Sequence, residues 1–174
     1  MAKKMSIKDL NKYLSSFKYG SIYGEFPYDY YSIEPALFER EKTGICWDFV
    51  AYEAWYFNKY FPKTDYRVYY IESDDGEFCH SFLVYKRIGM YHLFEACRAP
   101  KGIKQFNTIE ELLNYQVEKL VPYDIDNNRM PYIIFEYTPP EEYDLAVDAY
   151  MKHIYHTGKK IRSYENYFGL ISGV

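Results

Sequence analysis

The sequence contains few cysteines and no long hydrophobic run. Its three cysteines in 174 residues are too few for the disulfide framework of a small secreted domain. No apolar stretch reaches the ~20 residues that span a bilayer, and no apolar segment follows the charged N-terminus as it does in a signal peptide. We therefore expect a cytoplasmic protein with no membrane partner.

Excess positive charge and phosphate-binding motifs are also lacking. Lysine and arginine total 21 against 25 acidic residues, a net charge of −4, which gives no electrostatic basis for binding nucleic acid. Neither Gly-x-x-x-x-Gly-Lys nor Gly-x-Gly-x-x-Gly occurs. A small basic cluster at Lys159, Lys160 and Arg162 is interpreted as a solvated helix end. We expect no nucleic-acid partner and no cofactor.

Aromatic side chains, by contrast, are abundant. The chain has 23 tyrosines and 12 phenylalanines, which can fill a core, and its length suffices for one domain with a core of its own. No internal repeat, low-complexity tract or Pro/Gly-rich linker divides it. The sequence therefore predicts a single domain over residues 1–174.

Hydrophobic periodicity predicts helices first and a sheet later. Helices are predicted over 6–17, 34–41, 45–60, 109–120 and 141–156, and strands over 66–72, 78–87, 90–96 and 131–137. A tight turn at Ile88-Gly89 joins two of the strands into a hairpin. This order is typical of an α+β fold in which a helix packs on a mostly antiparallel sheet.

Cys46 stands where a turn of small residues, Thr43 and Gly44, enters the predicted helix 45–60. A thiol there is close to the positive end of the helix dipole and to backbone N–H groups that have no intrahelical partner. Both features favour the thiolate, which is the nucleophilic form. Asp48, in the first turn, opposes the thiolate if its charge is close.

The predicted hairpin brings a histidine and a carboxylate together. If its strands pair across the Ile88-Gly89 turn, His80 and Glu95 become diagonal neighbours on one face of the sheet. The remaining residues of that face are Phe82, Val84, Tyr91 and Leu93. Because this face is mostly apolar, we expect the helix that carries Cys46 to pack on it.

These three side chains form a set that can carry out acyl transfer. Cys46 would attack a carbonyl, His80 would move the proton, and Glu95 would hold the imidazole in one tautomer. The backbone N–H groups of Cys46 and Trp47 are candidates for the oxyanion site. The second oxyanion donor is not identified, and the loop 19–31 is the first place to look for it.

Three local motifs resemble the transglutaminase-like superfamily of papain-like cysteine enzymes. Gly-Ile-Cys-Trp-Asp-Phe at 44–49 resembles the Gly-x-Cys-Trp-x-Phe pattern around the nucleophile of that superfamily. The segment 80–84 resembles the strand that opens with the catalytic histidine. The segment 91–96 resembles the next strand, which normally ends in a catalytic aspartate. The resemblance covers about residues 43–100 and departs at Glu95, where aspartate is usual.

The resemblance implies a papain-like core in a small, single-domain member of the superfamily, without the accessory domains of protein cross-linking enzymes. It implies hydrolysis or acyl transfer at an amide of a peptide, a protein or a small molecule. Cys46, His80 and Glu95 would be the catalytic residues, and no metal or cofactor would be needed. A fold alone does not name the substrate.

Two other interpretations stay open. Cys79, His80, His92 and Cys97 are acceptable zinc ligands that lie close together in the predicted hairpin. Alternation counts against that set, because Cys79 and His80 point to opposite faces of the sheet. If no metal binds there, Cys79 and Cys97 are interpreted as structural residues. The second interpretation is a catalytically inactive binding module of the same fold, whose tyrosine-rich loops contact a partner.

Overall fold

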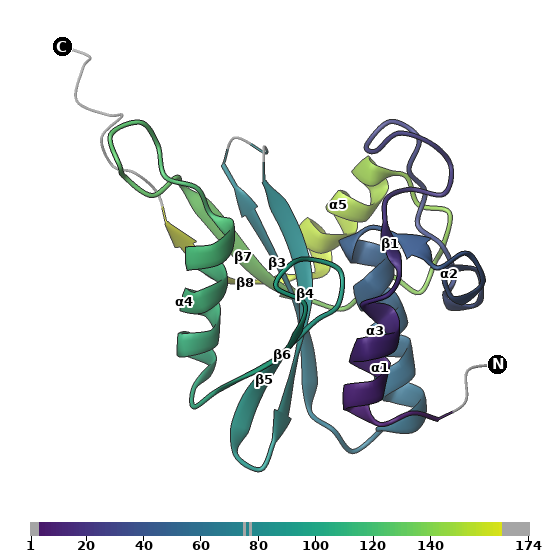
Figure 1. The fold of residues 1–174 in the computed structure, drawn as a ribbon. Coiled ribbons are helices and arrows are strands. Elements are labelled where there is room, and N and C mark those ends of the chain that lie inside the picture. Colours follow the sequence, from purple (N-terminus) through teal and green to yellow (C-terminus); the bar gives the residue numbers. More distant parts are fainter. Residues whose placement is uncertain (1–3, 75, 77, 165–174) are drawn as a thin grey trace.

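The computed structural model describes residues 4–74, 76 and 78–164, which form a six-stranded antiparallel sheet with helices on both faces (Figure 1). The helices are α1 (Ile7–Leu14), α2 (Pro35–Glu41), α3 (Cys46–Tyr60), α4 (Ile109–Leu120) and α5 (Val147–Thr157). The strands of this sheet are β3 (Tyr66–Ser73), β4 (Cys79–Arg87), β5 (Met90–Glu95), β6 (Gly102–Phe106), β7 (Tyr132–Tyr137) and β8 (Lys159–Tyr164). Their order is β6-β5-β4-β3-β7-β8. The predicted α+β class is confirmed.

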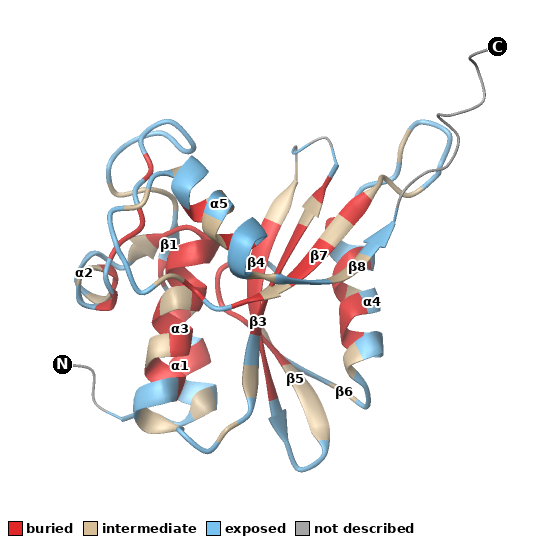
Figure 2. Ribbon diagram, turned by 180° about the vertical axis from the view of Figure 1, so that it is seen from behind, coloured by how far each residue is buried: buried red, intermediate tan, exposed pale blue. Residues whose placement is uncertain are grey.

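The sheet separates two hydrophobic cores. Helices α1, α2, α3 and α5 lie on one side and α4 lies on the other (Figures 1 and 2). Leu83, Tyr85 and Phe94 point into the core on the α3 side. The alternate residues Phe82, Val84 and Leu93 point into the core on the α4 side.

The expectation that the Cys46 helix packs on the face of Phe82 and Val84 is therefore wrong. Helix α3 packs on the opposite face, that of Leu83 and Tyr85. Both faces of β4 are apolar because the sheet is covered on both sides, so alternation shows which residues share a face but not which helix covers it.

The hairpin of β4 and β5 has the predicted register. Arg87 pairs with Met90 across a turn in which Ile88 and Gly89 have positive φ values of 50° and 77°, as a type I′ turn requires. The ladder ends at the pair Leu83 and Phe94. Beyond that pair the backbone of β4 has no partner in β5.

A second, two-stranded sheet leads into α3. In it, β1 (Lys18–Tyr19) pairs in parallel with β2 (Thr43–Gly44), and Tyr19 faces Gly44. A Cβ atom on Gly44 would lie 2.6 Å from the Phe38 ring and 2.8 Å from Cβ of Asp48. Only glycine fits between α2 and the first turn of α3, which explains the small residue two positions before Cys46.

Two predictions near the C-terminus are wrong. The last helix begins at Val147 rather than near 141, because Ser32 holds the preceding segment out of a helix: its backbone and hydroxyl bond the backbone of Asp144 and Leu145. The basic cluster 159–162 lies in the edge strand β8, not at a helix end. Charged side chains are common on edge strands, where they discourage pairing with another chain.

Among the described residues, none of the helices has both the length and the hydrophobicity of a membrane-spanning segment.

Candidate functional site

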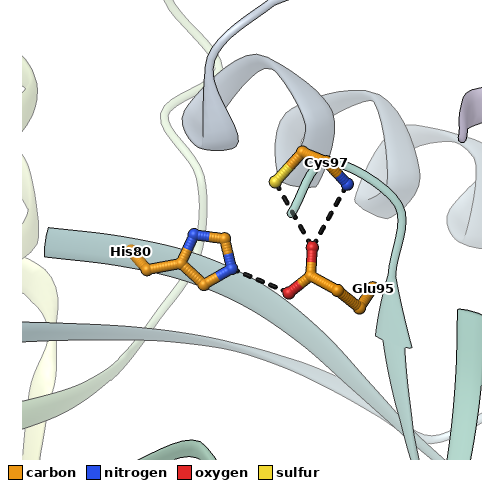
Figure 3. A group of neighbouring side chains, drawn as sticks. All are labelled: His80, Glu95 and Cys97. Atoms are coloured by element: carbon orange, nitrogen blue, oxygen red, sulfur yellow. Dashed lines mark hydrogen bonds and ion pairs between the residues drawn. The ribbon is translucent and has the colours of Figure 1, made fainter. Parts of the chain in front are cut away.

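The predicted histidine and carboxylate meet at the open end of the β4–β5 hairpin. His80 Nε2 lies 2.8 Å from Glu95 Oε2, and His80 and Glu95 are only 2% and 7% exposed. The pair spans the two strands just beyond the last ladder pair, in the diagonal relation that the turn predicts. In Figure 3 the imidazole points at one carboxylate oxygen, and Cys97 points at the other.

The turn after β5 holds the Glu95 carboxylate. Its Oε1 accepts hydrogen bonds from the backbone N–H groups of Cys97, at 3.2 Å, and Arg98, at 3.0 Å. The Cys97 thiol donates to the same oxygen at 3.4 Å. On the other side, Asn11 of α1 donates its side-chain amide to the Glu95 carbonyl at 3.0 Å. The Glu95 side chain therefore spans from the turn, which holds Oε1, to the imidazole, which contacts Oε2.

Hydrogen bonding keeps the Glu95 carboxylate charged. Burial raises its pKa, but the neighbouring His80 and the hydrogen bonds from His80, Arg98 and Cys97 outweigh burial and hold the pKa below its ordinary value. An ionised Glu95 accepts the proton of His80 Nε2. The other ring nitrogen, Nδ1, is then the one able to accept a proton from a nucleophile.

The Cys46 thiol lies close enough to Glu95 for the charge of the carboxylate to act on it. Its sulfur accepts a hydrogen bond from the backbone N–H of Ser81, the residue after His80. Ser81 lies beyond the end of the β4–β5 ladder, so its N–H is available. Among the described residues, the sulfur forms hydrogen bonds with Ser81 and Tyr19 and not with the imidazole.

The expected preference for a thiolate does not hold in this closed arrangement. Cys46 is 2% exposed, and burial, followed by Cys79, Asp48 and Glu95, raises its pKa above the ordinary value despite the Ser81 hydrogen bond. Desolvation disfavours the charged thiolate more than one helix terminus favours it. In this arrangement Cys46 is a neutral thiol.

Tyr19 is the functional candidate that sequence reasoning missed. The pairing of β1 with β2 places it opposite Gly44, and its hydroxyl forms a hydrogen bond with the Cys46 sulfur. Burial of the hydroxyl and the nearby thiols of all three cysteines raise its pKa. The only signal in the sequence is its position at the start of the loop named as the place to search.

Asp48 organises the first turn of α3. Its carboxylate accepts hydrogen bonds from the Ile45 N–H at 2.9 Å, the Tyr30 hydroxyl at 3.0 Å and the Ile33 N–H at 3.3 Å. It therefore connects the helix start to the 19–31 loop and the segment after it. The neighbouring Trp47 stacks on Tyr150 of α5, with ring centroids 4.4 Å apart, so Trp47 packs in the core.

We expect the stability of the protein to depend on Asp48 protonation. Burial raises the Asp48 pKa from 3.8 to about 7 although three hydrogen bonds oppose the rise. The folded state therefore holds the proton more tightly than the unfolded state does. Its stabilising contribution is complete below pH ~4 and is lost as the pH rises to ~7.

The test is the difference in unfolding free energy between wild type and Asp48→Asn. That difference should shift by roughly 2–4 kcal/mol between pH 4 and 7, with the advantage of wild type greatest at the acidic end. Urea unfolding at a series of pH values measures it, and groups that titrate equally in both proteins cancel. A difference that stays constant with pH would show that Asp48 is ionised throughout.

The four residues of the alternative zinc set, Cys79, His80, His92 and Cys97, do not all come together in the described part of the chain. His92 stacks on Tyr85, with ring centroids 4.7 Å apart, and pairs with Gln105 of β6. Among the described residues, the histidine, cysteine and carboxylate side chains that do gather are His80, Glu95 and Cys97. Alternation separates Cys79 from His80, as the sequence indicates.

The arrangement thus contains a buried thiol at a helix start, a histidine bonded to a carboxylate, and a tyrosine hydroxyl on the sulfur. No protein-family model matches the chain, and no curated protein matches its sequence.

Proposed function

We propose that the protein is a thiol-dependent amide hydrolase or acyltransferase with a papain-like, transglutaminase-like core and a triad of Cys46, His80 and Glu95. The observation that carries this proposal is the 2.8 Å contact between His80 Nε2 and Glu95 Oε2. It occupies one ring nitrogen and directs the imidazole so that Nδ1 can serve as the base. The sulfur adjoins the same stretch of β4, through the Ser81 N–H.

The reaction would proceed in two halves. His80 Nδ1 takes the thiol proton while the Cys46 sulfur forms a bond to the substrate carbonyl carbon. The protonated imidazole then delivers that proton to the leaving nitrogen, and the C–N bond breaks to leave a thioester. Water or an amine then gives a proton to His80 and attacks the thioester carbon. The C–S bond breaks, and the imidazolium returns the proton to the sulfur, which restores the thiol. Glu95 stays ionised and stabilises the imidazolium at each half.

The oxyanion would be stabilised by donors from two elements. Cys46 and Trp47 are the first residues of α3, so their N–H groups have no intrahelical acceptor. The Tyr19 hydroxyl, which lies on the sulfur, supplies the second donor once a carbonyl takes its place beside the thiol. Substrate binding therefore requires Tyr19 to move away from the sulfur.

The experiment is a screen of amides and short peptides in which mass spectrometry follows both product release and a covalent acyl adduct on the protein. We expect an adduct on the peptide that contains Cys46, with or without an added amine as acceptor. Cys79→Ala is the matched control, because it removes a nearby thiol outside the triad and should leave turnover unchanged. Adducts confined to Cys79 would contradict the assignment.

A second candidate function is a binding module without catalysis. Two observations favour it: Cys46 is a buried, neutral thiol, and several tyrosines in or beside the 19–31 loop are exposed. They are Tyr19, Tyr23, Tyr28 and Tyr31. Exposed tyrosines are common in interfaces. A Cys46 that resists iodoacetamide in the folded protein, at a pH where free thiols react, would favour this module over the enzyme.

A further inference from the structure

The proposed mechanism leaves the Cys97 thiol unused, although it lies against the triad. His80, Glu95 and Cys97 each offer one ligand atom, and all three atoms lie within 4.8 Å of one another. All three residues are buried. Figure 3 shows that they converge from β4, the end of β5 and the following turn.

These atoms suit a thiophilic divalent cation. Zinc binds imidazole nitrogen, thiolate sulfur and carboxylate oxygen at about 2.0–2.3 Å, which puts the ligand atoms of a tetrahedral site roughly 3.3–3.8 Å apart. A spread within 4.8 Å requires only small side-chain shifts to reach that geometry. A thiolate and a carboxylate also neutralise the two positive charges of the cation, so its burial does not leave a net charge in the core.

A second buried acid near the cluster strengthens the case. Glu53 of α3 is 2% exposed, and its Oε2 has no hydrogen-bond partner within the described part of the chain. Glu53 lies close enough to interact electrostatically with two of the ligand residues, Glu95 and Cys97. An unpartnered carboxyl oxygen in such a place is costly unless it meets a proton or a cation.

We propose that His80 Nε2, the Glu95 carboxylate and Cys97 Sγ form a binding site for a divalent cation of the zinc class, with Glu53 as a further buried carboxyl nearby. Of the four residues that the sequence offered, the site keeps His80 and Cys97, and Glu95 takes the place of Cys79 and His92. It does not depend on the proposed amide chemistry, but it shares His80 and Glu95 with it. A cation bound there and catalysis by the triad would exclude each other.

Binding follows a simple proton balance. The Cys97 thiol loses its proton to solvent when the sulfur–metal bond forms. The imidazole stays neutral, but its proton moves from Nε2 to Nδ1, because Nε2 now donates its lone pair to the cation. Glu95 is already ionised. One proton is therefore released for each cation, and His80 loses the free Nδ1 that the mechanism requires.

The test uses Co²⁺ alone, titrated into the reduced protein without substrate. We expect one Co²⁺ per chain, a sulfur-to-cobalt charge-transfer band in the near ultraviolet, and release of one proton. Cys97→Ser should remove the band and weaken binding at least tenfold. Cys79→Ser is the matched control and should keep both, since Cys79 lies outside the cluster.

Cadmium NMR of the wild-type protein gives a second readout that needs no variant. Coupling of the metal to the Cys97 β-protons and the His80 ring protons is expected. No stoichiometric charge-transfer band in wild type, or a band lost in Cys79→Ser but kept in Cys97→Ser, would overturn the proposal. If acyl adducts form on Cys46 but the protein binds no cation, the cation site is refuted and the proposed amide chemistry is not. If the protein binds the cation but forms no adducts, the cation site is supported and the amide chemistry is not.

Discussion

Replacing Cys46 with alanine should lower amide turnover at least 10³-fold, because in the proposed mechanism the bond to the substrate forms at its sulfur. The fold should tolerate the change. The side chain is small, and its loss leaves a cavity and deprives the Ser81 N–H of its acceptor, together worth about 1–2 kcal/mol of unfolding free energy. Turnover of a confirmed substrate and a thermal unfolding curve on the same sample measure the two effects.

Cys46→Ser serves as the companion variant. Its hydroxyl keeps an acceptor for Ser81 and a partner for Tyr19 but is a far weaker nucleophile without a matched base. We expect it to be as inactive as the alanine variant and closer to wild type in stability. Full turnover in either variant would mean that the reaction takes place elsewhere.

Replacing Glu95 with glutamine should lower kcat by roughly 10²–10⁴-fold, although only one atom changes type. Oε1 accepts two backbone N–H groups, those of Cys97 and Arg98, so the amide oxygen of glutamine must stay on that side. Its NH₂ group then faces His80 Nε2 and needs an acceptor there. The imidazole must therefore carry its proton on Nδ1, and the base can no longer take the thiol proton.

The NMR chemical shifts of the His80 ring nitrogens show directly which nitrogen carries the proton, and the measurement needs no substrate. Wild type should show the proton on Nε2 and Glu95→Gln should show it on Nδ1. Glu136→Gln, the same change on β7 in a carboxylate that bonds Arg67, is the matched control for both tautomer and rate. An unchanged tautomer together with an unchanged kcat would remove Glu95 from the mechanism.

The sequence predicted the parts of the site that depend on local rules. The Ile88-Gly89 turn, with alternation along β4, was enough to place His80 and Glu95 on one face at the observed diagonal. At the starts of α1 and α4, Ser6 and Thr108 each accept a backbone N–H three residues on, which is the usual way in which these residue types begin a helix. These features succeed because backbone geometry and short-range hydrogen bonds determine them.

What depends on contacts between distant segments was not predicted. Such contacts decide which face of the sheet α3 covers and bring the Tyr19 hydroxyl to the sulfur. They also form the strand β8, whose charged residues do not show the alternation typical of a strand. The neutral state of Cys46 is of the same kind. A helix start alone favours a thiolate, and only the surrounding chain, which buries the sulfur, reverses that preference.

The hydrogen bond from Asn11 to the Glu95 carbonyl joins segments that are 84 residues apart in the chain. It makes α1 part of the same cooperative unit as the turn that holds the carboxylate. Local unfolding of an N-terminal helix usually requires little free energy and does not disturb a distant site. Here it would release the acid from its support, so detachment of the first helix is a route by which this protein can lose its site while the central sheet stays folded.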